Sequence, residues 1–284
     1  MGSDRYFPDR PSPRIGIPLF DLILPYAGVV EKYLTLSLAV ISLLVSLYLV
    51  RSVRAIHKKL NRNADRVSKE LVSQTGRIKN ELGHVYHQVE AVEQLLPLLK
   101  LSAPLPPSRG WAASPDFLLT LAHVTRRVKP RLTVELGSGV SSLVLAKCGA
   151  KKIVSLDHSE EFGSQTRAML ASHGVRGVDI RIHELESYAG KYKWYARSTF
   201  KSLSKIDLLV IDGPPSSTNP DARYPALEHL IPLLSAKATI VLDDVDRDEE
   251  RKLADAIAKT LPNHVMTIYP HEKGTAVISP RTGK

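Results

Sequence analysis

Residues 132–146 read LTVELGSGVSSLVLA, a pattern that predicts a strand, a tight turn and the start of a helix. The apolar run ends in Glu135, and Gly137 and Gly139 then allow a sharp turn with close approach of a ligand to the backbone. A dinucleotide-binding fingerprint needs a third glycine where Ser142 stands. A carboxylate beside exposed N–H groups instead favours a cationic, hydroxyl-bearing ligand.

A second acidic residue, Asp157, ends the next predicted strand, KKIVSLD. Together the two segments resemble motif I and the ribose-binding acid of class I S-adenosylmethionine (SAM) methyltransferases. In that family the glycine turn lies against the methionine part of SAM, and the later acid accepts the two ribose hydroxyls. By this resemblance the SAM-binding residues are Glu135, Gly137, Ser138, Gly139, Asp157, His158 and Asp212.

Alternating strands and helices over residues 101–284 predict a mostly parallel α/β sheet with right-handed crossovers. We expect strands at 152–156, 178–183, 206–212 and 238–244, helices at 115–128, 160–172, 221–235 and 247–261, and a final hairpin that turns at 272–274. This order is similar to the Rossmann-like, seven-stranded sheet of class I methyltransferases, so the resemblance covers residues 101–284.

The chain is basic, with 39 Lys and Arg against 29 Asp and Glu and a net charge of +10. Such a charge suits either nucleic acid or an anionic membrane surface. Cys148 is the single cysteine, so no intrachain disulfide can form and a reducing compartment is expected.

Residues 33–50, YLTLSLAVISLLVSLYLV, form an uncharged run of 18 residues. A helix of this length spans about 27 Å, close to the ~30 Å hydrocarbon core of a bilayer. The run starts late and lacks a cleavage site, which predicts a single-pass cell-membrane anchor rather than a signal peptide. Basic residues crowd its C-terminal side and place the following domain in the cytoplasm. Residues 1–32 are rich in proline and are expected to lack long regular structure.

Residues 51–100 are predicted to form a helical stalk. Between 56 and 96 the apolar positions recur at eleven-residue and then seven-residue spacing, which leaves one narrow stripe on a polar helix. Such a stripe predicts a homo-oligomeric coiled coil. The alternative is a lone helix packed along the catalytic domain. Pro97 is expected to end the helix, and further prolines form a short linker.

The expected strands at 206–212 and 238–244 end in three carboxylates, namely Asp212, Asp243 and Asp244. Close carboxylates repel one another unless a cation neutralises them, and Mg²⁺ prefers oxygen ligands. The arrangement resembles metal-dependent small-molecule O-methyltransferases, and by that resemblance the three residues are the metal ligands. Pro215 stands where catechol-type members carry a lysine base. The alternative is that Asp243 and Asp244 cap the next helix.

The proton-accepting group has three candidates: Asp212, His183 and His271. The acceptor is expected to lie between the loop after residue 212, which contains Ser216, Arg223 and Tyr224, and the aromatic stretch 188–200.

The sequence therefore predicts a membrane-anchored bacterial SAM methyltransferase that acts on a hydroxyl of a small-molecule, sugar or lipid-linked acceptor. One alternative is a catalytically silent SAM-fold domain that serves as a coiled-coil scaffold. The other is a nucleic-acid methyltransferase, which is less favoured because Asp-Gly-Pro-Pro replaces the base-amine motif after residue 211.

Overall fold

The structure is a computed structural model that describes residues 19–107 and 112–281, without the side chains of residues 19–27. The chain divides into two compact units, Met1–Arg77 and Ile78–Lys284. Helix α1 (Leu19–Leu99) supplies all of the regular structure described in the first unit and the first element of the second.

The first unit contains the predicted membrane segment. An 18-residue window of the helix has a mean hydropathy of 2.2, and none of that window is buried. The prediction that residues 1–32 lack long regular structure lies outside the described residues for 1–18 and is wrong from Leu19 onward. The apolar run before the membrane segment continues the helix, and Pro25 removes one local hydrogen bond without ending it.

The second unit is built on a seven-stranded sheet in the order β3-β2-β1-β6-β7-β9-β8. The strands are β1 (Thr133–Leu136), β2 (Ile153–Asp157), β3 (Val178–Ile182), β6 (Ile206–Ile211), β7 (Leu234–Asp243), β8 (His264–Tyr269) and β9 (Thr275–Pro280). Strand β9 runs antiparallel to both of its neighbours, and the other registered neighbours are parallel. The predicted mostly parallel, Rossmann-like sheet with a final hairpin is therefore confirmed.

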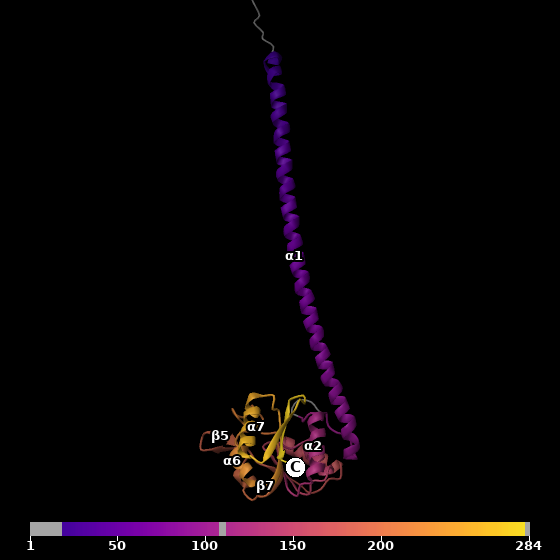
Figure 1. Cartoon of the computed structure of the whole chain (residues 1–284), viewed down its shortest axis with the longest axis vertical. Coiled ribbons are helices and arrows are strands. Elements are labelled where there is room, and N and C mark those ends of the chain that lie inside the picture. The colour runs from indigo at the N-terminus through magenta and orange to yellow at the C-terminus, as the bar shows by residue number, and fades with distance from the viewer. Residues whose placement is uncertain (1–18, 108–111, 282–284) are drawn as a thin grey trace, which may run out of the picture. The chain divides into compact units, whose positions relative to one another are not determined.

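Helices cover both faces of this sheet. They are α2 (Pro115–Val128), α3 (Val140–Lys147), α4 (Glu160–Ser172), α5 (Arg197–Phe200), α6 (Ala226–His229) and α7 (Asp248–Thr260). Alternate residues of β6 point to opposite faces: Leu208 and Val210 pack with α2 and α3, whereas Leu209 and Ile211 pack with α7. Figure 1 shows α2 and α7 on opposite sides of the strands.

One expected element differs from the structure, and one element was not expected. The helix predicted at 221–235 is only α6 followed by a 3₁₀ turn, Ile231–Leu233, because Pro225 and Pro232 interrupt it. A short antiparallel hairpin, β4 (Glu186–Tyr188) and β5 (Tyr192–Trp194), was not predicted. The alternative role for Asp243 and Asp244 as caps is also wrong, because α7 has Arg247 at its N-cap position.

The last turns of α1 belong to the core of the second unit. Ala91, Leu95 and Leu99 are each at most 4% exposed, and Leu95 and Leu99 pack in the same apolar cluster as α2 and α3. The helix ends at Leu99, two residues beyond Pro97. The predicted boundary between stalk and catalytic domain at residues 100 and 101 therefore differs from the structure, because these side chains pack with the domain.

Candidate active site

The glycine turn lies between β1 and α3, beside the end of β6. Gly137 has φ of +87°, and a Cβ atom there would lie 3.1 Å from the backbone oxygen of Asp212. A side chain is therefore excluded by both the backbone conformation and the close approach. Gly139 precedes α3, and nothing in the described structure lies within 4 Å of where its Cβ would be. The turn thus leaves open space next to backbone N–H groups.

Asp157 ends β2 beside this turn and is 4% exposed. One carboxylate oxygen, Oδ2, accepts hydrogen bonds from the backbone N–H of Ser138 at 3.0 Å and from its hydroxyl at 2.5 Å. The other, Oδ1, accepts from the N–H of Ser159 at 3.0 Å. His158 Nδ1 lies 3.9 Å from Oδ1. The structure therefore brings Gly137, Ser138, Asp157 and His158 together.

Glu135 is a fully buried residue of β1, paired with Ser155 of β2, and it is not among the described residues that line the cavity. Its Oε2 accepts hydrogen bonds from the hydroxyls of Ser142, at 2.5 Å, and Ser155, at 2.6 Å. Burial raises its pKa to about 7, although the hydroxyl contacts oppose that rise. The hydrogen bonds of Glu135 thus connect β1 with β2 and with the first turn of α3. They stabilise the two elements that flank the glycine turn.

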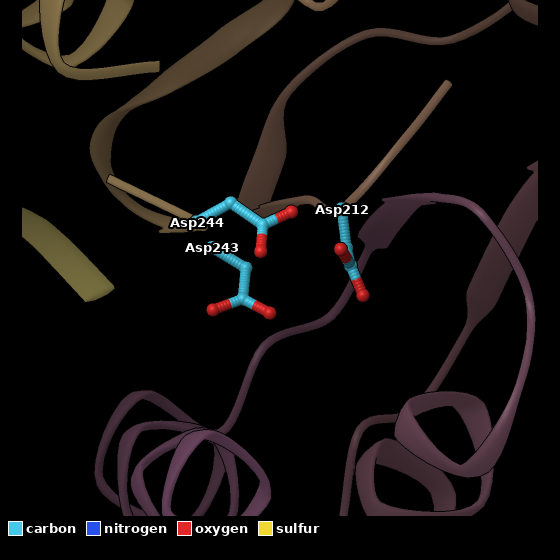
Figure 2. Close-up of side chains that lie close together, drawn as sticks. All are labelled: Asp212, Asp243 and Asp244. Atoms are coloured by element: carbon cyan, nitrogen blue, oxygen red, sulfur yellow. The ribbon is translucent and has the colours of Figure 1, made fainter. Parts of the chain in front are cut away.

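Asp212, Asp243 and Asp244 approach one another at the ends of β6 and β7. One carboxylate oxygen from each lies within 4.8 Å of the others, and Figure 2 shows the three side chains facing a common space. Asp244 has φ of +64°, a conformation that is uncommon outside glycine and that recurs at functional sites. The predicted acidic cluster therefore exists.

A buried cation, Arg223, lies inside this cluster and is 5% exposed. Its Nη2 donates to Asp244 Oδ2 at 2.7 Å and to Asp212 Oδ1 at 3.2 Å, and its Nη1 donates to the backbone oxygen of Asp243 at 3.0 Å. Arg247 Nη1 also lies 3.0 Å from Asp244 Oδ2. Arg223 was expected only to border the acceptor. In the structure it lines the cavity and also binds the carboxylates of Asp212 and Asp244.

Burial controls the charge of the cluster. It raises the pKa of Asp243 to about 8, with the neighbouring Asp212 and Asp244 acting in the same direction. Burial also raises the pKa of Asp212 to about 6, which Arg223 opposes and Asp244 favours. For Arg223, burial acts to lower the pKa, but the surrounding carboxylates overcome it and raise the pKa. Burial and the mutual repulsion of the carboxylates therefore favour the protonated forms of Asp243 and Asp212, and the guanidinium of Arg223 opposes this shift.

These residues do not fit a magnesium ion in the arrangement that the structure shows. Arg223 bridges Asp212 Oδ1 and Asp244 Oδ2, and Asp243 Oδ1 accepts from the hydroxyl of Thr275 at 3.3 Å. A divalent ion on the oxygens that are left would lie next to a guanidinium, and like charges repel strongly in a buried site. Asp244 Oδ1 is buried and has no hydrogen-bond partner among the described residues.

One cavity of about 1140 Å³ connects the glycine turn with the acidic cluster. Its lining includes Gly137, Gly139, Asp157, Asp212, Arg223 and Asp244. Cavities that hold one drug-sized ligand measure about 300–1,000 Å³. This cavity therefore has room for a cofactor and an acceptor side by side.

Tyr195 is a cavity residue that the sequence did not single out from its aromatic stretch. Its side chain is 1% exposed, and its hydroxyl has no hydrogen-bond partner among the described residues. A Cβ atom on Gly213 would lie 2.6 Å from that hydroxyl, which places it beside the end of β6. An unpaired buried hydroxyl is costly, and this one lies in a residue of the cavity wall.

The two histidines proposed as bases do not line the cavity in the described residues. His183 is exposed after β3. His271 is held by two hydroxyls, with Nε2 3.2 Å from Thr120 Oγ1 and Nδ1 2.9 Å from Thr275 Oγ1. Of the three candidates, Asp212 alone is among the described cavity residues.

Most of the residues that were predicted to surround the acceptor also lie outside the described cavity lining. Of residues 188–200, only Tyr195 is among the described cavity residues, because the neighbouring rings of Tyr188, Tyr192 and Trp194 pack around His229. Ser216 and Tyr224 likewise fall outside that lining.

Residues 134–245 match the model of a family described as a methyltransferase domain. No curated protein matches the chain. Among solved structures, a methyltransferase from Geobacter sulfurreducens is 17% identical, covers 73% of this chain and 97% of its own, and has a TM-score of 0.47. An O-methyltransferase from Bacillus cereus, solved with S-adenosylhomocysteine (SAH), is 16% identical to this chain. The match covers 68% of this chain and 91% of that protein, with a TM-score of 0.47.

A third structure is the O-methyltransferase TomG from Streptomyces achromogenes, involved in tomaymycin synthesis and solved with SAM. It is 17% identical, covers 70% of this chain and 96% of its own, and has a TM-score of 0.47.

The family match, the strand order and the glycine turn next to Asp157 coincide in one domain. The second unit of the chain therefore contains a class I, SAM-dependent methyltransferase domain.

Proposed function

We propose that the chain is a membrane-anchored methyltransferase that transfers the methyl group of SAM to a hydroxyl of a small-molecule, sugar or lipid-linked acceptor. The observation that carries this proposal is the single cavity that joins the glycine turn to a cluster of carboxylates. The first part suits a cofactor, and the second suits a substrate whose proton must be removed.

The residues around the turn fit SAM. Asp157 has a carboxylate that Ser138 already orients, so it can accept two ribose hydroxyls. The open space above Gly139 admits the methionine part, and the unpaired hydroxyl of Tyr195 can meet a polar group of the ligand. His158 lines the cavity next to Asp157, where it can contact the adenine. SAM supplies a methyl group made electrophilic by its positively charged sulfur.

Methyl transfer to oxygen requires a base and good alignment. The acceptor oxygen forms a bond to the methyl carbon while the carbon–sulfur bond breaks and leaves its electron pair on sulfur. The hydroxyl proton must move to the protein, and Asp212 Oδ2 is a carboxylate oxygen at the acceptor end of the cavity that Arg223 leaves free. The remaining task of the chain is to hold the acceptor in line.

Helix α1 supports membrane anchoring. Its apolar segment at residues 33–50 is exposed and long enough to cross a bilayer, and basic residues follow it at once. On this arrangement the methyltransferase domain is cytoplasmic. The basic residues next to the segment are Arg51, Arg54, Lys58, Lys59 and Arg62.

The stripe on the stalk supports self-association. Leu60, Val67, Leu71 and Leu82 are between 54% and 63% exposed, so their apolar surface is available to a second copy. Ala91 and Leu95 lie on the part of the helix that packs into the domain core, which limits a coiled coil to the residues before them.

The proposed activity can be tested in membranes that contain the overproduced full-length chain. Incubation with tritium-labelled SAM should transfer label to organic-extractable lipids or to added sugars and phenols, and an ether or methyl-ester product is distinguished by its stability to alkali. Asp157→Ala should abolish the transfer, whereas Arg131→Met, on an exposed ion pair with Asp207, should leave it unchanged. SAH binding without transfer to any acceptor would favour the silent scaffold.

A further inference from the structure

We propose that Arg223 is the resident cation of the acidic cluster and takes the place of the divalent metal ion that the sequence predicted. The guanidinium then fixes the carboxylates of Asp212 and Asp244 at the acceptor end of the cavity without a bound metal. This inference rests on the proposed function, because it concerns the same cavity and the same reaction.

The guanidinium of Arg223 contacts three acidic side chains and one backbone oxygen. Nη2 bridges the carboxylates of Asp212 and Asp244, Nη1 holds the backbone oxygen of Asp243, and Nε lies 3.7 Å from Glu250 Oε1. A planar guanidinium is suited to such a fork because its donors lie in fixed directions. It therefore sets the orientation of both carboxylates, as a bridging metal would.

The loop that carries Arg223 is fastened to α7. The N–H of Asp221 donates to Glu249 Oε2 at 3.0 Å, and Lys252 Nζ lies 5.4 Å from the centre of the Tyr224 ring. The backbone oxygen of Arg223 accepts from the N–H of Ala226 at 3.1 Å, at the start of α6. These contacts fix the position of the loop, and the loop in turn places the guanidinium of Arg223 among the carboxylates.

The arrangement leaves Asp212 Oδ2 as the carboxylate oxygen of the cluster that an acceptor can reach. Asp244 Oδ1 is buried and has no partner among the described residues, and Asp212 Oδ2 is not used by Arg223. Asp244 lines the cavity, and its Oδ2 is held by Arg223. Arg223 acts through these carboxylates and is a positioning residue.

The test measures metal binding directly. The full-length protein in detergent micelles is titrated with Mn²⁺, an octahedral stand-in for Mg²⁺ whose free-ion electron paramagnetic resonance signal falls when it binds. The wild type should leave the signal unchanged. Arg223→Met should bind about one Mn²⁺ per chain, because close carboxylates without a counter-charge are the ligands that such a cation prefers.

Three variants serve as controls. Arg131→Met removes an exposed arginine at the other end of the sheet and should match the wild type. Arg223→Lys keeps a positive charge and should also bind no Mn²⁺. Asp243→Ala added to Arg223→Met should abolish the new binding, because it removes one of the oxygen ligands. If Arg223→Met does not fold, Arg223→Gln takes its place. The wild-type titration is independent of both variants, and Mn²⁺ binding there would by itself overturn the proposal.

Stoichiometric Mn²⁺ binding by the wild type would overturn the proposal, and so would a folded Arg223→Met that binds none. SAH titration of the same samples separates this outcome from the proposed function. A wild type that binds neither SAH nor Mn²⁺ contradicts the methyltransferase proposal but not the role of Arg223 as the counter-charge.

Discussion

Asp157 Oδ2 accepts hydrogen bonds from both the backbone N–H and the hydroxyl of Ser138. The residue between the two glycines of the turn therefore orients the carboxylate that ends the neighbouring strand. Because β1 and β2 are paired in parallel, the turn and the acid meet at the same edge of the sheet. This relationship brings two separate sequence motifs together in the lining of one cavity.

Tyr195→Phe tests whether the unpaired hydroxyl of Tyr195 meets the cofactor. Loss of one hydrogen bond to a charged ligand group should weaken SAH binding about 10- to 100-fold, while stability stays equal or rises because a buried unpaired hydroxyl is removed. The measurements are calorimetric titration and thermal unfolding.

Tyr192→Phe is the matched control, because Tyr192 is outside the described cavity lining and its hydroxyl lies 3.0 Å from His229 Nε2. It should leave SAH affinity unchanged. Equal affinity in Tyr195→Phe would place the hydroxyl away from the cofactor.

Glu135→Gln tests the buried carboxyl beneath the turn. Folding raises the pKa of Glu135 from 4.5 to about 7, so the folded state binds the extra proton between these values. The stabilisation is present at low pH and is lost as the pH rises through about 7. An amide does not titrate and can still accept from the Ser142 and Ser155 hydroxyls.

The free energy of unfolding of Glu135→Gln, relative to wild type, should therefore rise by about 2–3 kcal/mol between about pH 5 and about pH 8. Urea unfolding at both pH values measures this difference. A difference that is the same at both would show that Glu135 titrates normally.

Leu95→Ala tests the boundary between stalk and domain. Leu95 is 2% exposed in the core of the second unit, so truncation should lower the free energy of unfolding by about 2–5 kcal/mol. Val72→Ala, at a 71% exposed position on the same helix, should change it by less than about 0.5 kcal/mol. Chemical unfolding followed by tryptophan fluorescence gives both values. Equal effects would put α1 outside the core.

The membrane anchor is tested by extraction. Because apolar burial is not screened by salt, the full-length chain should stay in the membrane pellet after washes with concentrated salt and with alkaline carbonate. A chain in which residues 33–50 are deleted provides the control and should be released by salt. Release of the full-length chain by salt alone would mean that its basic surface holds it.

The sequence predicted the parts of the domain in which a local pattern maps directly onto structure. Apolar strands that end in acids predicted β1, β2, β6 and β7, and the parallel sheet then required Asp212, Asp243 and Asp244 to meet at one edge. Helix α4 has the predicted bounds because periodicity and a serine N-cap agree there.

The remaining features depend on contacts that no local pattern encodes. Arg223 comes from a turn-rich loop without periodicity, so its position between the carboxylates could not be predicted. Tyr195 follows a three-residue strand that is too short to recognise. Leu95 and Leu99 continue the helical pattern of the stalk, which hides the point where α1 enters the core.

The central claim is that this domain binds SAM through the turn and Asp157. Calorimetric titration of the full-length protein in detergent micelles with SAM and SAH tests it most directly. Wild type should bind both, and Asp157→Ala should lose about 10²-fold or more in affinity, because two hydroxyls lose a charged acceptor. Binding of neither ligand by folded wild type, or unchanged affinity in Asp157→Ala, would contradict the claim.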